Sequence, residues 1–473
     1  MSGKLLLTCV VVLMASLLLG GTAPAQVIKV SDAIEAGPSG VPVGGVSAAR
    51  CGNNLVVGFA DADASFGNSF DGYAVSSDGG KTFRDLGVLP VSSQVGDFGP
   101  DILGNAGTFT PGPTSEFVSS GDSSLACGSA SVFYYASIYL SDNPGPSCPG
   151  SPFCSAISVS TSTDGGVSWN LPVFAVSTAE DNNSLLFPSI AVDPSNPQRV
   201  YVAYLLWNNF GPLDFIPGCE TVSTLNGIMV IKVASSADGG NTWTQSSVEN
   251  TCAITNYGFP ELVAPSIAVS ATGEVYVAYE SLIPGVVNDI HFARSLDQGQ
   301  TFSAPLKVSS TAIANAQPKL ALDRTRSRHT GAIYLAWSGA PGGTYTDVLV
   351  SKSLDKGLSF SFPQPTSAAP PRGTGRFQVD PALAVDNDGQ VQACFYETPS
   401  NQPSSSSVYS YNCDISHNRA TTWRTRQMTG GVPPGYDSLT SDFLLQHDGF
   451  FTAFELQNSS AQRHVVGEES DLN

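Results

Sequence analysis

Positive charge is scarce in this sequence. Its 473 residues contain 21 Lys and Arg against 40 Asp and Glu, which gives a formal net charge of −19. An acidic protein repels the phosphates of nucleic acids and of anionic lipids, so we expect neither as a partner. Charged residues make up only 13% of the chain, whereas glycine and proline are plentiful. This balance is typical of turn-rich all-β proteins, and 41% hydrophobic residues suffice for a large core.

Several motifs of well-known chemistry are missing. The sequence has no Cys-x-x-Cys pair, no His-Glu-x-x-His segment and no Gly-x-Ser-x-Gly elbow. Phosphate-binding loops and dinucleotide fingerprints are absent as well. These gaps argue against thiol redox centres, zinc ribbons, zinc proteases, serine hydrolases and nucleotide-dependent enzymes.

Long hydrophobic runs are confined to the N-terminus. Lys4 precedes an apolar run over residues 5–19, and Ala23-Pro24-Ala25 follows as a small-x-small cleavage site. This pattern predicts a secretory signal peptide over residues 1–25. No other stretch approaches the roughly 20 apolar residues that a membrane span needs. We therefore expect a secreted or extracytoplasmic protein without a membrane span.

Eight cysteines remain once Cys9 leaves with the signal peptide. An even number of cysteines in an exported chain predicts disulfide bonds. Two of them flank a predicted hairpin almost symmetrically, two close a short local loop, two lie near a long insertion, and the last two pair by elimination. The expected pairs are, in that order, Cys394–Cys413, Cys148–Cys154, Cys219–Cys252 and Cys51–Cys127.

The most informative feature is a repeat. The pattern Ser-x-Asp-x-Gly-x-Thr/Ser-Trp/Phe occurs five times, with a worn sixth copy at residues 416–423. Its aspartates, at intervals of 58 to 86 residues, are Asp78, Asp164, Asp238, Asp297 and Asp355. Short apolar segments such as "PSIAVD" and "VYVAYE" precede each copy with period-2 patterning. Four strands per unit at this spacing predict the four-stranded antiparallel blades of a β-propeller.

The repeated stretch lies between the third and fourth strands of each unit. Glycine supplies the positive φ of a tight turn, and Asp and Ser side chains can hold the turn closed through backbone N–H groups. Because it recurs on every blade, we interpret it as a structural joint rather than an active site.

These repeats resemble the Asp box, or BNR repeat, of the sialidase (neuraminidase) superfamily. The resemblance covers nearly the whole of residues 26–473, which we expect to form a single propeller domain. It implies that the boxes lie on the face opposite the active site. It does not imply sialidase activity, because similar boxes occur in other exported propellers, some catalytic and some purely binding.

The number of blades depends on the two ends of the chain. Three further strands are predicted after the sixth copy, and residues 26–34 resemble the end of a fourth strand. Pairing of the first strand with the last three would give seven blades and leave no open edge. A six-bladed ring with terminal extensions, as sialidases have, is the alternative.

The longer insertions fall on the face opposite the boxes, at residues 61–71, 141–155, 207–227 and 363–375. Loops that a rigid scaffold presents are common binding sites. Oxygen ligands suited to calcium occur at Asp61 and Asp63 and in the turn that contains Asp386 and Asp388. No cofactor is required by this interpretation, although calcium is a candidate ligand.

Sialidases, by resemblance, use three arginines to hold the substrate carboxylate. The Arg-Ile-Pro motif that begins this triad is absent, and Asp63 stands where a second family segment has arginine. Carboxylates remain as catalytic candidates: Glu280 and Glu455 follow a small–aromatic pair at the ends of two strands, Tyr396 holds that position in a third, and Asp71 follows an insertion. Two of them could perform glycoside hydrolysis.

We therefore expect an exported propeller that binds a glycan or protein with its loop-rich face and performs no catalysis. A glycoside hydrolase of the exo-α-sialidase type is the alternative. An arginine cluster around a deep pocket would favour the enzyme, and a shallow pocket with an acidic entrance would favour the binding module.

Overall fold

The structure is a computed structural model whose description covers most of the chain. The described residues are 27–30, 46–60, 71–90, 118–141, 154–178, 183–208, 228–250, 261–283, 287–313, 316–325, 330–341, 343, 345–368, 375–386, 388–400, 407–432, 441–445, 449–457 and 463–471. The predicted signal peptide lies outside them. Within these ranges, no helix is both long enough and apolar enough to cross a membrane.

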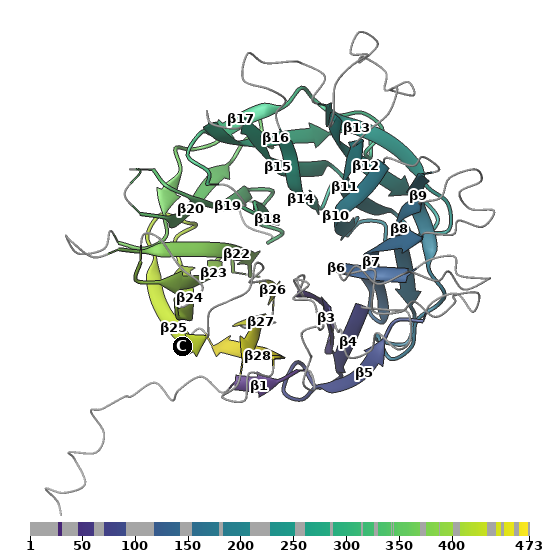
Figure 1. Ribbon diagram of the computed structural model, residues 1–473, viewed down its shortest axis with the longest axis horizontal. Helices are drawn as coiled ribbons and strands as arrows, with labels where there is room; N and C mark the ends of the chain where they lie inside the picture. The colour runs from purple at the N-terminus through teal and green to yellow at the C-terminus, as the bar shows by residue number, and fades with distance from the viewer. Residues whose placement is uncertain are drawn as a thin grey trace, which may run out of the picture.

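The strands form a ring of four-stranded antiparallel sheets around a central axis (Figure 1). Six of the seven sheets consist of consecutive strands, and the labelled strands of these sheets run from the centre of the ring to its rim in chain order in Figure 1. The expected all-β propeller is therefore confirmed. Its regularity follows from the period-2 patterning, since one face of each strand packs against the preceding sheet and the other against the next.

Six sheets consist of four consecutive strands each. They are β2 (Ser47–Cys51), β3 (Asn54–Ala60), β4 (Asp71–Ser76) and β5 (Arg84–Val88); β6 (Val118–Ser129), β7 (Val132–Ser141), β8 (Cys154–Ser162) and β9 (Val173–Thr178); β10 (Asn183–Val192), β11 (Val200–Asn208), β12 (Ile228–Ser236) and β13 (Thr244–Asn250); β14 (Glu261–Val269), β15 (Val275–Ile283), β16 (Val287–Ser295) and β17 (Leu306–Ser309); β18 (Lys319–Leu322), β19 (Ile333–Gly339), β20 (Asp347–Ser353) and β21 (Gln364–Pro365); and β22 (Phe377–Val385), β23 (Val391–Thr398), β24 (Tyr409–Ser416) and β25 (Arg424–Val432).

The remaining sheet joins the two ends of the chain. It contains β26 (Ser441–Leu445), β27 (Gly449–Gln457), β28 (Arg463–Asp471) and β1 (Val27–Lys29). β1 pairs with β28 in antiparallel register, with Ile28 opposite Gly467. The predicted pairing of the first strand with the last is thus confirmed, and the ring has no gap between its ends (Figure 1). Residues 363–375, expected as an insertion, include the short strand β21.

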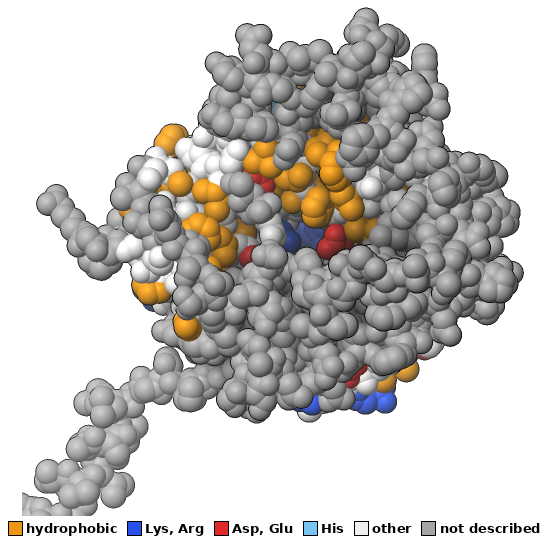
Figure 2. Space-filling view, viewed as in Figure 1, with side chains coloured by type: hydrophobic (Ala, Val, Ile, Leu, Met, Phe, Trp, Pro, Cys, Tyr) orange, Lys and Arg blue, Asp and Glu red, His pale blue; other side chains and the backbone are white. Residues whose placement is uncertain are grey.

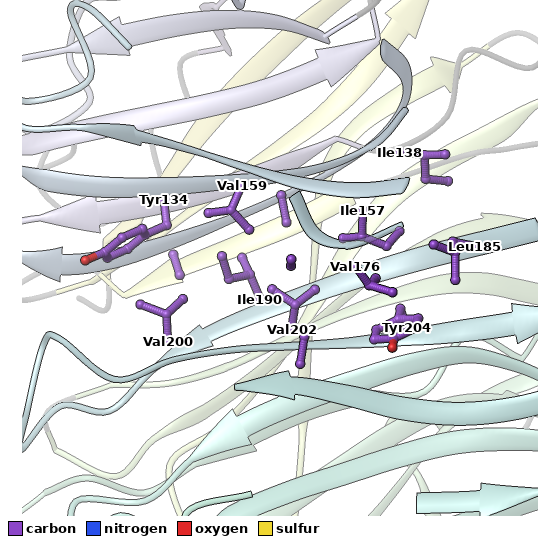
Figure 3. Close-up of a cluster of buried hydrophobic side chains, with 14 of the residues drawn as sticks. Tyr134, Ile138, Ile157, Val159, Val176, Leu185, Ile190, Val200, Val202 and Tyr204 are labelled. Atoms are coloured by element: carbon purple, nitrogen blue, oxygen red, sulfur yellow. The ribbon is translucent and has the colours of Figure 1, made fainter. Parts of the chain in front are cut away.

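Hydrophobic side chains fill the spaces between neighbouring sheets. Between the β6–β9 and β10–β13 sheets, Ile157 and Val159 meet Val200, Val202 and other buried side chains, as Figure 3 shows. All four are at most 2% exposed. Because each sheet contributes to two such layers, the core is distributed around the ring.

The repeated turns have one geometry. In the first, the Ser76 hydroxyl donates to Asp78 Oδ1 at 2.7 Å and accepts the Gly80 N–H at 2.9 Å. The Thr82 N–H donates to Asp78 Oδ1 at 3.0 Å, and its hydroxyl donates to Oδ2 at 2.6 Å. The other copies repeat these bonds at Asp164, Asp238, Asp297 and Asp355. The worn copy keeps two of these bonds, since Asn418 Oδ1 accepts the Ser416 hydroxyl at 3.0 Å and the Thr422 N–H at 2.8 Å, but here the side-chain amide donates to the Thr422 hydroxyl at 2.8 Å.

These turns are also packed against the neighbouring blade. Gly357, at φ +77°, has no room for a side chain because a Cβ would lie 2.3 Å from the Phe292 ring of the preceding sheet. The turns bond to the connection between the first two strands of their own sheet, as when the Gly239 N–H donates to the Gln198 carbonyl at 2.8 Å. Both sets of turns therefore share one face of the ring, which we call the turn face.

Because of the turn aspartates, we expect the stability of the fold to fall at acidic pH. Hydrogen bonds from a hydroxyl, with further backbone N–H groups, lower the pKa of Asp78, Asp238, Asp297 and Asp355 to about 2. Their stabilising effect is complete above the unfolded value near 3.9 and is lost as pH falls through about 2. We expect the Asp238→Asn variant, which copies Asn418, to lose less of its melting temperature than the wild type between pH 4 and 2, when both are followed by circular dichroism. An equal loss in the two proteins would contradict this assignment.

Two of the expected disulfides are present. Cys51–Cys127 links β2 to β6 and so joins two neighbouring sheets, with Cα atoms 5.5 Å apart. Cys394–Cys413 links directly opposite residues of β23 and β24, with Cα atoms 4.0 Å apart. Both pairings are confirmed. Cys148, Cys219 and Cys252 lie outside the described residues, and so does the side chain of Cys154, so the other two pairs remain predictions.

Candidate functional site

The innermost strands share an irregularity at the centre of the ring. In β6, β10, β14 and β22, two residues oppose one residue of the next strand. The first of the two, or its counterpart just before β18, has positive φ: Asp122, Phe187, Ala264, Gln317 and Asp380. Four of these residues precede proline. β-Bulges of this kind re-aim a side chain, and all five residues line one central pocket.

The central pocket has a volume of about 370 Å³, within the range of small-molecule sites. Figure 2 shows acidic and basic side chains deep in a central hollow whose described walls are largely hydrophobic. The walls include Phe187, Pro188, Ile190, Pro265 and Leu320. The polar groups are three carboxylates, one lysine, one amide and five serines: Asp122, Glu280, Asp380, Lys319, Gln317, Ser47, Ser123, Ser124, Ser189 and Ser266.

Asp122 is the most unusual of these polar groups. Its carboxylate has no hydrogen-bond or ion-pair partner among the described residues. Burial in the pocket wall raises its pKa to about 6. Its backbone is held at φ 57°, a conformation that Asp tolerates better than most residues. A partly buried carboxyl group without a partner among the described residues is costly to the fold, and such groups gather at functional sites.

Serines two residues beyond the bulge tie neighbouring sheets together. In three sheets this position is a serine that lies opposite an alanine of the second strand. Each hydroxyl accepts a backbone N–H from the next sheet: Ser124 from Ile190 at 3.0 Å, Ser189 from Ile267 at 3.2 Å and Ser266 from Leu320 at 3.0 Å. In the β18–β21 sheet this position, opposite Ala336, is Lys319. A lysine ammonium cannot accept a hydrogen bond, so Lys319 departs from the structural pattern.

The remaining carboxylates lie in neighbouring sheets. Glu280, in β15, is fully buried, and its Oε2 accepts the Ala316 N–H at 2.8 Å just before β18. Asp380, at the bulge of β22, is 3% exposed. Glu280 thus helps to fix the segment that carries Gln317 and Lys319, and it is the one catalytic candidate from the sequence that the described structure places in the pocket.

The other catalytic candidates have different surroundings. Tyr396 is fully buried and packs edge-on against Tyr411, with ring centroids 4.9 Å apart. Asp71 is fully buried at the start of β4 and accepts a hydrogen bond from the Ser137 hydroxyl of the next sheet. Neither lines the pocket. Glu455 lies in β27, and its side chain is outside the described residues.

The calcium candidates fall into two groups. Asp386 accepts the N–H groups of Asp388 and Gln390 at 2.9 and 2.8 Å and the Gln390 side-chain amide at 2.8 Å. Its oxygens therefore close a turn. Asp61 and Asp63 lie outside the described residues. Among the described residues, no three Asp, Glu, His or Cys side chains are arranged to hold a metal ion.

No arginine lines the pocket among the residues described. Arg50 donates to the Gly52 carbonyl at 2.6 Å, and Arg294 donates to the Lys356 carbonyl at 2.9 Å. Arg376 is buried against Asp347. Arg372 lies outside the described residues. These three arginine side chains therefore do not form a cluster that could bind a carboxylate.

The sequence analysis missed Asp122, Lys319 and Asp380. A signal was present, because the segments "FPSIAV", "APSIAV", "QPKLAL" and "DPALAV" align without gaps. The residue before proline differs in all four segments, whereas the apolar pattern after it repeats. The third position is serine in two segments, lysine in one and alanine in one. Variable positions within a repeat are where individual blades acquire separate roles.

Comparisons with solved structures show where this fold occurs. An ulvan lyase bound to a -[GlcA(1-4)Rha3S]- fragment matches with a TM-score of 0.51 at 11% identity over 95% of each chain. An α-L-arabinofuranosidase from Fusarium graminearum matches with a TM-score of 0.49 at 11% identity, over 95% of this chain and 98% of that one. A Trypanosoma rangeli sialidase in complex with sialic acid matches with a TM-score of 0.42 at 13% identity over 77% of this chain, which spans about half (55%) of the sialidase.

The sequence matches no protein-family model and no curated protein. At such low identities the structural likeness shows the fold alone. The chain thus shares its overall fold with the ulvan lyase.

Proposed function

We propose that this chain is an exported carbohydrate-binding propeller whose ligand occupies the central pocket, and that it does not hydrolyse sialosides. The observation that carries the proposal is the pocket itself, in which bulged strands of separate sheets direct unlike side chains into one cavity. Export is supported by the two disulfides, which persist in oxidising compartments.

The pocket has the mixed character that a sugar requires. A sugar ring has hydroxyl groups around its edge and apolar C–H groups on its faces. Asp122, Gln317 and the serines offer hydrogen bonds to hydroxyls, and Phe187, 38% exposed, offers an aromatic surface to a ring face. The volume of about 370 Å³ suits one or two sugar residues rather than a folded protein partner.

Exo-sialidase activity has little support from the same pocket. A sialoside carboxylate is held best by guanidinium groups, which bind carboxylates in a two-pronged fashion. The described lining supplies three carboxylates and a single lysine. We therefore expect no appreciable hydrolysis of a fluorogenic sialoside between pH 4 and 8, with or without calcium.

The proposal is tested by retention on a glycan array. Phe187→Ala should weaken retention at least tenfold because it removes the aromatic wall, and Ala264 shows that alanine fits the same bulge at φ 50°. Leu358→Ala is the matched control, since Leu358 is a 63% exposed hydrophobic residue in the repeated turn at 353–360. Equal retention of the two variants, or no retention of the wild type, would refute the proposal.

Asp122→Asn separates binding from folding. Burial raises the pKa of Asp122 above its unfolded value, so its charge destabilises the fold as pH rises from about 4 through about 6. The variant should therefore melt at a higher temperature than the wild type at pH 7.5 and yet retain less glycan. A loss of both stability and binding would point to a purely structural role.

A glycoside hydrolase is the second candidate function. It is favoured by Asp122, because a carboxyl group with a pKa of about 6 can donate a proton near neutral pH. Glu280 and Asp380 are the possible second carboxylates. Turnover of any aryl glycoside that Asp122→Asn abolishes would establish this function in place of the binding role.

A further inference from the structure

We propose that Lys319 determines the specificity of the central pocket by binding an anionic group, a carboxylate or sulfate, on the ligand sugar. This inference rests on the proposed carbohydrate-binding function and narrows it to acidic sugars. Lys319 is the one cationic side chain among the described residues that line the pocket.

The register of the strands shows that Lys319 occupies the position at which other sheets have a serine that links neighbouring sheets. It lies opposite Ala336, as Ser189 lies opposite Ala203 and Ser266 opposite Ala278. Those serines bind the next sheet, whereas a lysine cannot accept the corresponding N–H bond. At this position, a charged residue that lines the pocket thus stands in place of a serine that would bind the next sheet.

The ammonium of Lys319 has no partner among the residues that the structure describes. None of their carboxylates lies within 4.0 Å of it, and none of them forms a hydrogen bond with it. Asp122 lies in the sheet of β6, and two complete sheets separate it from Lys319 in β18. An amine and a carboxyl group that have no partner within the described part of the chain thus line different sides of one cavity. Groups that are left unpaired in a pocket favour a ligand that supplies the missing partners.

The two sides suggest how an acidic sugar would lie. Its anionic substituent would meet Lys319, and its hydroxyls would reach Asp122 and the serines nearby. Phe187, in β10 between these two sheets, would contact the ring face. A sugar with one acidic substituent satisfies all three contacts, whereas a neutral sugar leaves the lysine without an anionic partner.

The inference is tested by calorimetric titration of the purified chain with glucuronate, galacturonate and galactose 6-sulfate, and with glucose and galactose as neutral references. We expect at least one acidic sugar to bind at least tenfold more tightly than its neutral counterpart. Lys319→Ser should remove this preference by weakening the binding of the acidic sugar at least tenfold. The variant should fold, because it restores the residue found in three other sheets. Lys319→Arg should keep the preference.

The negative outcomes distinguish a failure of the proposed role of Lys319 from a failure of the proposed carbohydrate site. Neutral sugars that bind as tightly as acidic ones, or a preference that survives Lys319→Ser, would overturn the role of Lys319 and leave the carbohydrate site intact. Tighter binding of glucosamine than of the acidic sugars would do the same, because it would show that the carboxylates dominate the pocket. Absence of binding by every sugar would refute the carbohydrate proposal as well. Comparison of the titrations with the two uronates and with galactose 6-sulfate identifies whether a carboxylate or a sulfate is preferred.

Discussion

Deletion of residues 26–34 is expected to lower the melting temperature by about 10 °C or to cause aggregation. The deletion removes β1, which pairs with β28, and with it Val30, which is 2% exposed against Val46, Leu55 and Phe59. Loss of the buried Val30 side chain, the partly buried Ile28 side chain and a strand ladder costs about 5 kcal/mol, which for a large domain corresponds to about 10 °C. It also exposes the edge of β28 to other chains.

Point variants provide the control for this deletion. Val30→Ser should reproduce part of the loss because it places a hydroxyl in the hydrophobic cluster, whereas Lys29→Ser changes an exposed side chain. Differential scanning fluorimetry and light scattering would record both effects. An unchanged melting temperature after deletion would mean that the six sheets of consecutive strands are self-sufficient and that the sheet formed by the chain ends is an extension.

Arg376→Ala is expected to destabilise the fold by about 3–5 kcal/mol at neutral pH, the cost of leaving a buried charge without its partner. Arg376 is 7% exposed; its guanidinium pairs with Asp347, donates to the Ala368 carbonyl at 2.5 Å and lies over the Tyr345 ring at 5.4 Å. Asp347 is 1% exposed. Without the arginine, Asp347 would keep its charge in the interior with no cation beside it.

The loss should depend on pH in a defined direction. Burial raises the pKa of Asp347, Arg376 opposes that rise, and Glu397 and Asp414 add to it. Removal of Arg376 raises this pKa further, so the folded state gains stability as pH falls through the raised value and Asp347 becomes protonated. Denaturant unfolding should therefore show a smaller loss at pH 5 than at pH 8. The double variant Arg376→Met, Asp347→Leu should recover most of the stability, and a loss below about 1 kcal/mol or without pH dependence would contradict the account.

The architecture could be predicted from the sequence because every blade repeats the same pattern of strands and turns. Alternating apolar residues, glycine at the tight turn and an aspartate that closes it recur often enough to define a strand pattern without any knowledge of long-range contacts. The pairing of β1 with β28 was also predictable, since an unpaired strand at each end of a ring is unfavourable. Cys394 and Cys413 followed from their symmetric places in one hairpin.

The candidate site was harder to predict because it depends on where several distant strands converge. Glu280 was found by its place after a small–aromatic pair, but the same rule selected Tyr396, whose ring is buried against Tyr411. Asp122 was missed because "DSSL" lacks the proline that marks the other bulges. Only the three-dimensional structure shows that Asp122, Lys319 and Asp380 line one cavity.

Hydrogen–deuterium exchange with and without a retained glycan tests most directly whether the central pocket is the binding site. We predict protection in four segments that are far apart in sequence and that line the pocket, residues 122–125, 187–190, 263–267 and 317–320. The repeated turns at residues 76–83 and 353–360, on the turn face, should exchange at unchanged rates. Protection confined to the turns, or absent from the four pocket segments while the glycan is bound, would contradict the account.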